Sequence, residues 1–161
     1  FERCRRYGGT ISLVVMDADD FKSVNDTYGH DVGDEVLKAI GATLLLQRRA
    51  SDRVCRLGGE EFAGLLVETD AAGALTAAER IRDAVANTVV EVEGYAITNT
   101  ISLGVATVCD QDSGFEGLFR RADQACLDAK AAGKNQVRVS DCEAQYVARS
   151  EGDGLREGRL A

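Results

Sequence analysis

The sequence contains no long hydrophobic run. Its longest mostly apolar stretch, residues 11–16, is interrupted by Ser12, whereas a membrane-spanning helix needs about 20 apolar residues. A signal-peptide pattern is also absent. These absences exclude a membrane segment from this piece of chain and leave open whether a longer protein is anchored to a membrane.

Cysteine and histidine are sparse and are not spaced for metal binding. The five cysteines lie far apart, none forms a Cys-x-x-Cys pair, and the chain has one histidine. This pattern excludes a zinc site built from Cys and His. The odd number and wide spacing of the cysteines favour a reducing, cytoplasmic compartment, and Cys126 is expected to be a buried thiol on an apolar helix face.

Positive charge is in deficit, since 27 acidic residues face 19 lysines and arginines and the net charge is −8. This balance excludes a domain that binds nucleic acid along a basic face. A nucleotide substrate is still allowed, because a metal ion and a few local cations can neutralise a triphosphate.

The length and composition indicate one folded domain. The chain has 161 residues, 45% of them hydrophobic, and neither a repeat nor a long block of one charge sign is present. Residues 1–140 are expected to form the domain, and residues 141–161 a partly flexible tail. Because the chain does not begin with methionine, we expect it to be a piece of a longer protein.

Hydrophobic periodicity predicts an α/β fold with helices packed on a mixed sheet. Strands are predicted at residues 11–16, 53–57, 62–67, 89–92, 96–108 and 136–139, and helices at residues 31–47, 71–85 and 115–129, with the end of a further helix at residues 1–7. The two strands around the Gly58-Gly59 pair read as a hairpin. The order of the strands in the sheet does not follow from this pattern.

Two acidic groups stand where ligands are often bound. Asp17 directly follows the first strand, and Glu60 and Glu61 follow the two glycines of the hairpin. If the hairpin pairs beside the first strand, Asp17 and Glu60 face each other and repel unless a cation joins them. Mg²⁺ binds through a few carboxylates plus substrate phosphates, so the pattern suits metal-assisted phosphoryl transfer. A solvated acidic loop is the alternative.

Four sequence blocks resemble, in order and spacing, those of the GGDEF family of diguanylate cyclases. They are residues 17–34 (DADDFKSVNDTYGHDVGD), 56–62 (RLGGEEF), 100–106 (TISLGVA) and 122–135 (ADQACLDAKAAGKN). The resemblance implies a nucleotidyl-cyclase palm-like fold with a central, mainly antiparallel sheet. It also implies condensation of two GTP into cyclic di-GMP and two pyrophosphates, with each of two facing domains holding one GTP.

The resemblance assigns roles to matching positions. A Mg²⁺ or Mn²⁺ ion would be held by Asp17, the Ala18 carbonyl and Glu60, with Glu61 serving a second metal or the attacking hydroxyl. The GTP contacts would come from Phe21, Lys22, Asn25, Asp34, Gly58, Gly59, Lys130 and Lys134. Within that set the guanine edge would be read by Asn25 and Asp34, and the outer phosphates would be held by the three lysines and the backbone turn at Phe21.

A second site is implied by Arg49 and Asp52, an RxxD pair placed where the family binds its product as an inhibitor, with Arg80 as a further cation. An exposed ion pair of little weight is the alternative. Arg53 departs from the family pattern and is expected to alter affinity there. The implied partners are GTP, cyclic di-GMP, a second copy of the domain and an upstream sensor or regulatory domain.

Two rival functions stay open. A catalytically silent GGDEF domain would bind GTP or cyclic di-GMP and signal to a neighbour. Silent members typically lose an acidic residue of the signature or the first aspartate, whereas this chain retains Asp17, Glu60 and Glu61. An enzyme with relaxed purine choice is the other rival. The carboxylate at Asp34 favours guanine over it.

Overall fold

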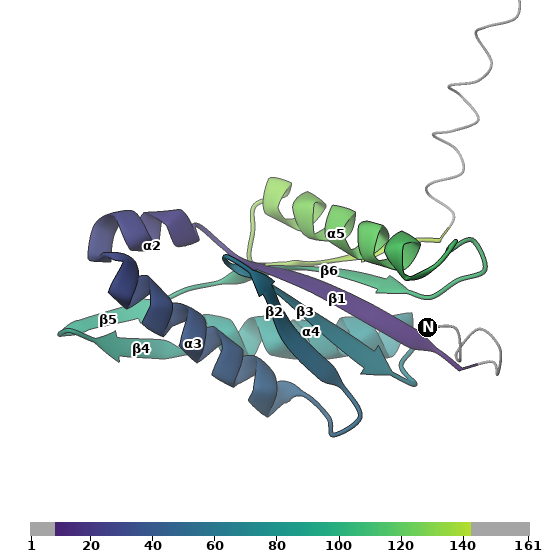
Figure 1. The fold of residues 1–161 in the computed structure, drawn as a ribbon, viewed down its shortest axis with the longest axis horizontal. Helices are drawn as coiled ribbons and strands as arrows, with labels where there is room; N and C mark the ends of the chain where they lie inside the picture. The colour runs from purple at the N-terminus through teal and green to yellow at the C-terminus, as the bar shows by residue number, and fades with distance from the viewer. Residues whose placement is uncertain (1–8, 143–161) are drawn as a thin grey trace, which may run out of the picture.

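The structure is a computed structural model, and it describes residues 9–142. Eleven elements follow one another in this range (Figure 1): β1 (Ile11–Ala18), α2 (Phe21–Tyr28), α3 (His30–Gln47), β2 (Arg53–Gly58), β3 (Glu61–Val67), α4 (Ala71–Ala86), β4 (Val89–Val92), β5 (Tyr95–Thr98), β6 (Ile101–Thr107), α5 (Phe115–Ala131) and β7 (Val137–Ser140). The helix expected at residues 1–7 and most of the expected tail lie outside the described residues.

The main sheet has five strands in the order β2-β3-β1-β6-β7. β1 lies at its centre and pairs antiparallel with β3 and with β6, while β7 runs parallel to β6 at one edge. β2 and β3 form the predicted hairpin. β4 and β5 form a separate two-stranded ribbon. The predicted α/β fold with a mixed, mainly antiparallel sheet is therefore confirmed.

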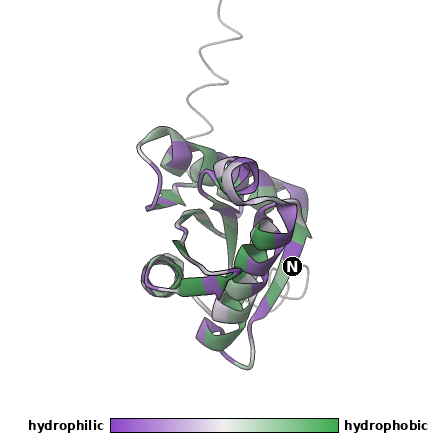
Figure 2. Ribbon diagram, turned by 90° about the vertical axis from the view of Figure 1, so that its left-hand side faces the viewer, coloured by the Kyte–Doolittle hydropathy of each residue, from purple (hydrophilic) through white to green (hydrophobic). Residues whose placement is uncertain are grey.

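Helices cover both faces of this sheet (Figure 1). Val14 and Met16 of β1 face α3 and α4 in the larger hydrophobic cluster. Leu13 and Val15 point to the other face, where they pack with Leu118 of α5. Because both faces of β1 are covered, the strand is apolar along most of its length. The hydropathy colouring shows green, hydrophobic stretches in the strands that lie between the helices (Figure 2).

Two elements differ from the sequence predictions. Residues 21–28, expected to be a loop, form helix α2, although Asn25 and Asp26 have low helix propensity. α2 is held by tertiary packing, since Phe21 and Val24 are buried one turn apart against the core. The long strand expected at residues 96–108 is divided into β5 and β6, which belong to different sheets.

The cysteines depart from the expected pattern of unpaired thiols. Cys109, after β6, forms a disulfide with Cys142, after β7. The expectation of a reducing compartment rested on unpaired cysteines, and this disulfide contradicts that pattern. The cytoplasmic location therefore stays a prediction without this support. Cys126 is buried as expected, and burial raises the pKa of its thiol to about 12. Between residues 9 and 142, no helix is both long enough and apolar enough to cross a membrane.

Candidate active site

The end of β1 and the β2–β3 hairpin bring the predicted carboxylates together. Asp17 lies opposite Glu61 in the β1–β3 register, and the Ala18 N–H donates to the Glu60 carbonyl at 3.2 Å. The hairpin therefore pairs beside β1, which is the arrangement that makes Asp17 and Glu60 neighbours. Gly59 has a left-handed backbone (φ 52°) that favours glycine.

The hairpin tip is braced and open. The Arg56 guanidinium donates to the Gly59 carbonyl from Nε (2.8 Å) and Nη2 (2.6 Å). A Cβ atom built at Gly58 or Gly59 would meet nothing within 4 Å. The backbone at these two glycines is thus accessible to a ligand approaching the carboxylates.

At the end of β1, the positive charge of Lys130 offsets part of the negative charge of the acidic side chains. Partial burial raises the pKa of Glu60, the nearby negative charges of Asp17 and Glu61 raise it further, and the charge of Lys130 opposes them. Burial lowers the pKa of Lys130, but its hydrogen bond to Asp17 and the charges of Asp17 and Glu60 outweigh that effect and leave the pKa raised. Asp17 and Glu60 thus stabilise the charged form of Lys130.

Three predicted lysines lie on two elements and a loop. Lys130, in the last turn of α5, donates from Nζ to Oδ1 of Asp17 at 2.7 Å. Lys134, just beyond α5, donates to Oδ1 of Asp20 at 2.5 Å. Lys22 lies exposed in the first turn of α2. Lys130 and Lys134 therefore both reach the acidic residues at the end of β1 from the C-terminal end of α5.

The proposed guanine-reading residues meet where α2 and α3 join. A Cβ atom at Gly33 would lie 1.9 Å from the Asn25 Oδ1 atom and 3.1 Å from the ring of Phe21. The absence of a side chain at Gly33 therefore lets the Asn25 amide lie against α3, one residue from Asp34. Asp34 is exposed and Asn25 is partly exposed, so both can reach a ligand.

The donor set fits a hard divalent cation that also binds phosphate. No group of three or more His, Cys, Asp or Glu side chains in residues 9–142 forms a closed metal cage. Asp17 and Glu60 nevertheless present carboxylates close enough to repel each other, next to the Ala18 backbone. Mg²⁺ is commonly bound by one or two carboxylates, with water and phosphates completing the shell.

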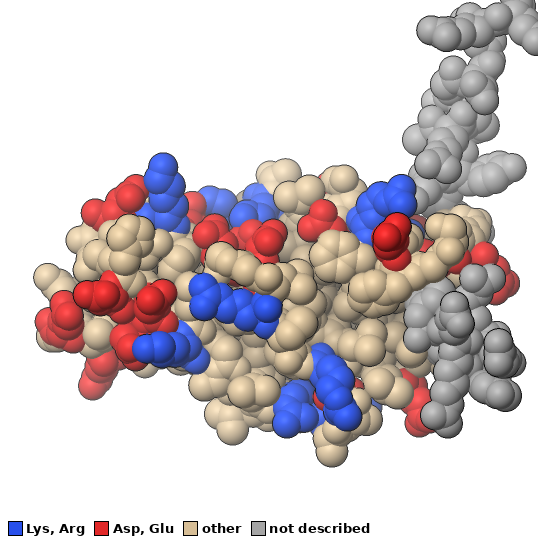
Figure 3. Space-filling model, in the orientation of Figure 1, with Lys and Arg blue, Asp and Glu red and all other residues tan. Residues whose placement is uncertain are grey.

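Acidic side chains gather at the end of the molecule where α2 and the start of α3 lie (Figure 3). This surface would repel a free triphosphate at long range. A nucleotide at the end of β1 would need cations, such as Lys130, Lys134 or a metal ion, to offset this charge.

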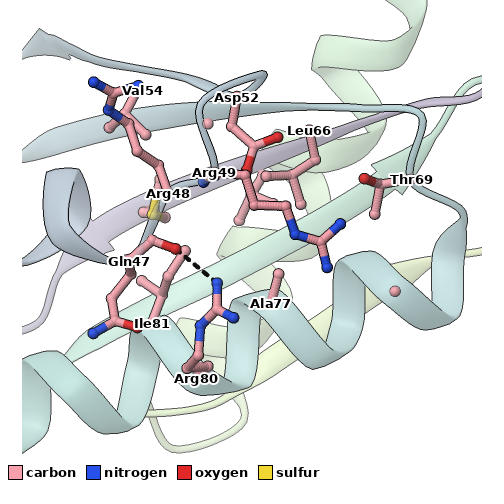
Figure 4. Close-up of a pocket in the computed structure, with 14 residues that line it drawn as sticks. Gln47, Arg48, Arg49, Asp52, Val54, Leu66, Thr69, Ala77, Arg80 and Ile81 are labelled. Carbon is pink, nitrogen blue, oxygen red and sulfur yellow. Dashed lines mark hydrogen bonds between the residues drawn. The ribbon is translucent and has the colours of Figure 1, made fainter.

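The residues of the second predicted site also come together. Arg49 lies in the loop after α3 and Arg80 on α4, and both line the same small hollow of about 20 Å³ (Figure 4). Arg80 Nη2 donates to the Gln47 carbonyl at 2.6 Å. Because the hollow is too small for a dinucleotide, a ligand held here would lie across the surface, where both arginines are exposed.

Asp52 does not behave as an exposed ion-pair partner. It is buried, with 3% of its surface exposed, and its Oδ2 accepts from the Arg49 backbone N–H at 2.9 Å. Arg53 donates to the carbonyls of residues 50–52. Asp52 and Arg53 therefore fix the loop conformation, and the Arg49 side chain is left for other contacts.

One buried polar residue at the site was not predicted from the sequence. Asp19, two residues after Asp17, has only 3% of its surface exposed. Asp19 lies in one of the four resembling blocks and its partners lie in two others, which was the available signal. They are Thr100, Ser102 and Asn135.

The fold and this site define a class of α/β domain in which carboxylates and lysines meet at the end of a central strand. Comparison of the sequence with known protein families identifies the family within this class. Residues 1–136 match the family model described as diguanylate cyclase, GGDEF domain. The chain belongs to this family.

Relatives and solved structures agree. The chain is 40% identical over 140 residues to the probable diguanylate cyclase DgcC of Escherichia coli K12, covering 87% of this chain but 38% of the relative. It resembles the active GGEEF domain of a diguanylate cyclase from Vibrio cholerae (31% identity, TM-score 0.81, covering 88% of this chain and 89% of that one). It also resembles the DgcB GGDEF domain of Caulobacter crescentus in complex with c-di-GMP (31% identity, TM-score 0.81, covering 86% of this chain and 82% of that one).

Proposed function

We propose that this domain is a diguanylate cyclase that condenses two GTP into cyclic di-GMP and two pyrophosphates. The observation that carries the proposal is the juxtaposition of Asp17 and Glu60 at the end of β1, with Lys130 bonded to Asp17. The family and the active GGEEF domain from Vibrio cholerae support it.

The proposed metal ligands are Asp17, the Ala18 carbonyl and Glu60, with Glu61 serving a second metal or orienting the attacking hydroxyl. A bound Mg²⁺ or Mn²⁺ would supply charge stabilisation at the α-phosphate and favour ionisation of the 3′-hydroxyl. The protein holds these carboxylates on a paired strand and a braced hairpin, so little reorganisation is needed when the substrate binds.

The proposed GTP site runs from the α2–α3 corner to the end of α5. Asn25 and Asp34 would bind the guanine edge, because a carboxylate accepts hydrogen bonds from N1–H and the exocyclic amine. Gly58 and Gly59 would lie against the sugar and the α-phosphate. The β- and γ-phosphates would be held by Lys22, Lys130, Lys134 and the backbone turn at Phe21.

The reaction requires two copies of the domain. Each 3′-oxygen forms a bond to the α-phosphorus of the other GTP, the bond to the β-phosphate oxygen breaks, and pyrophosphate leaves with that electron pair. The 3′-proton passes to a neighbouring base or to water. A single domain with one GTP would bind substrate without turnover, so we propose a homodimer as the active form.

The same proposal includes product inhibition at the RxxD site, where Arg49 and Arg80 would contact the product and the buried Asp52 would hold the loop that carries Arg49. Two exposed guanidinium groups beside one hollow suit the phosphates and guanine edges of a cyclic dinucleotide. The DgcB domain from Caulobacter crescentus was solved in complex with c-di-GMP, which supports product binding by this kind of domain.

Chromatography of nucleotides after incubation with GTP and Mg²⁺ tests the proposal. The yield of cyclic di-GMP should rise more steeply than linearly with protein concentration and vanish in Glu60→Gln. GTP binding without any product, from dimeric protein at high concentration, would instead indicate the silent receptor. Mixed dinucleotides formed from GTP and ATP would indicate relaxed purine choice.

A further inference from the structure

Asp19 is the most highly connected buried carboxylate near the proposed phosphate site. Its Oδ1 accepts from Ser102 Oγ at 2.6 Å, and its Oδ2 accepts from Thr100 Oγ1 at 2.7 Å and from the Asn135 backbone N–H at 3.0 Å. Its own N–H donates to the Thr100 carbonyl at 2.8 Å, and its carbonyl accepts from Asn99 Nδ2 at 2.9 Å. Asp19 therefore joins β1, the start of β6 and the loop after α5.

The two segments that Asp19 fixes have unusual backbones. Asp20, the next residue, has φ 52°, and Lys134 and Asn135 have φ 64° and 44°. Left-handed conformations in non-glycine residues persist only where the surroundings determine them. The Asn135 N–H bonded to Asp19 is one such determinant. A second is the bond from the Lys134 N–H to the Ala129 carbonyl at 3.1 Å.

Both segments carry phosphate-binding groups in the proposed function. One presents the backbone turn that begins α2, and the other presents the Lys134 ammonium group, which meets the first at Asp20. The Asn135 side chain is tied separately, since its Oδ1 accepts from Arg82 Nη1 of α4 at 2.9 Å. The Asp19 carboxylate is thus the shared anchor of the two halves of the phosphate site.

We infer that Asp19 is a positioning residue that sets the Lys134 loop and the turn at Asp20 at the spacing needed for the outer phosphates of the nucleotide. It lies too deep to touch the ligand itself, with 3% of its surface exposed. This inference rests on the proposed GTP site. It predicts that losing Asp19 weakens binding of the triphosphate far more than binding of the guanosine part.

Equilibrium binding separates these contributions without catalysis. The probes are 3′-deoxy-GTP, which lacks the attacking hydroxyl, and GMP, which lacks the outer phosphates, both with Mg²⁺. Asp19→Ala leaves three donors unsatisfied and should weaken 3′-deoxy-GTP binding by tenfold or more. GMP binding should change by less than about twofold, which is within the usual effect of a remote change. Asp19→Asn should restore much of the loss, because the amide oxygen still accepts and the hydroxyls can rotate.

Ser12→Ala is the matched control. Ser12 is a buried polar residue near the other end of β1, bonded to the Thr69 carbonyl and to Thr107 Oγ1, each at 2.8 Å. It should lower stability without changing the ratio of the two affinities. If Asp19→Ala does not fold, Thr100→Val removes one donor from Asp19 at nearly constant shape and should change the ratio in the same direction.

Equal weakening of both ligands, or no weakening of either, in folded Asp19→Ala or Thr100→Val would overturn the inference. Failure of Asp19→Asn to recover any of the selective loss would also overturn it. Wild-type protein that binds neither ligand would refute the proposed function itself, a separate outcome.

Discussion

Nζ of Lys130 lies 2.7 Å from Oδ1 of Asp17, so a lysine proposed to bind phosphate is bonded to a carboxylate proposed to bind metal. The two side chains are 30% and 15% exposed, and their attraction is therefore less screened than in a surface pair. α5 thereby fixes its last turn against the end of the central strand. A metal–nucleotide complex binding here would replace the Lys130–Asp17 bond with contacts of both groups to the substrate.

Lys130→Met should reduce cyclic di-GMP synthesis by about 100-fold, because it removes a cation proposed to stabilise the departing pyrophosphate, and losing one preorganised donor at developing charge costs about 10²–10³ in rate. It also removes the positive charge that lowers the pKa of Glu60. The acid limb of the pH–rate profile should therefore move to higher pH. Lys38→Met is the control, since Lys38 forms an exposed pair with Glu35 on α3. Equal rates for both variants would contradict the proposed role of Lys130.

Glu60→Gln should abolish synthesis and stabilise the domain at neutral pH. The pKa of Glu60 is raised in the folded state, so ionising this group costs stability as the pH rises above its usual value of 4.5. The gain in Tm of the variant should be present at pH 7 and should disappear below pH 4.5. Thermal unfolding across this range, without metal, measures it. A gain that persists unchanged in acid would show that the cause is not the cost of ionising Glu60, which comes first from burial and then from the charges of Asp17 and Glu61.

Gly33→Ala should weaken GTP binding by roughly tenfold or more, because the new methyl group displaces the Asn25 amide. Oδ1 is the end of a flexible side chain, so the fold should survive. Gly41→Ala on the same helix is the control: its Cβ would meet only Phe62, at 3.8 Å, and alanine favours the helix by about 1 kcal/mol. GTP titration and thermal unfolding of both variants test this. Unaltered GTP affinity in Gly33→Ala would remove Asn25 from the guanine site.

Arg49→Ala and Arg80→Ala should each weaken cyclic di-GMP binding by about tenfold or more, as expected for losing one charge-assisted contact. Initial synthesis rates should stay near those of the wild type, with progress curves that no longer flatten. Arg120→Ala, an exposed position on α5, is the control. Calorimetric titration with the product gives the affinities. Unchanged affinity in Arg49→Ala would refute the inhibitory site.

Reduction of the Cys109–Cys142 disulfide should destabilise the domain by about 2–4 kcal/mol, which lowers Tm by roughly 10 °C. The bond joins residues 33 apart in sequence and encloses α5 and the loop with Lys134. Cys109→Ser should reproduce the effect and abolish the response to reductant. Cys55→Ser, at an exposed free thiol, should do neither. A Tm independent of reductant would show that the two thiols do not pair in solution.

The sequence alone predicted most strands and helices, because β1 and the helix faces have clear hydrophobic periods. It also predicted the hairpin, through the Gly58-Gly59 pair, and the resemblance supplied the proposed roles at Asp17 and Glu60. These features depend on neighbouring residues or on short motifs. They could therefore be read without knowing which strands are adjacent.

Tertiary structure decided the rest. Helix α2 forms from residues of poor helix propensity because Phe21 and Val24 reach the core. Asp19 becomes buried because β6 and the loop after α5, some 80 to 116 residues along the chain, supply its donors. The Cys109–Cys142 pairing follows from the parallel β6–β7 arrangement. In each case the deciding partner is distant in sequence, and only the packing of the sheet brings it near.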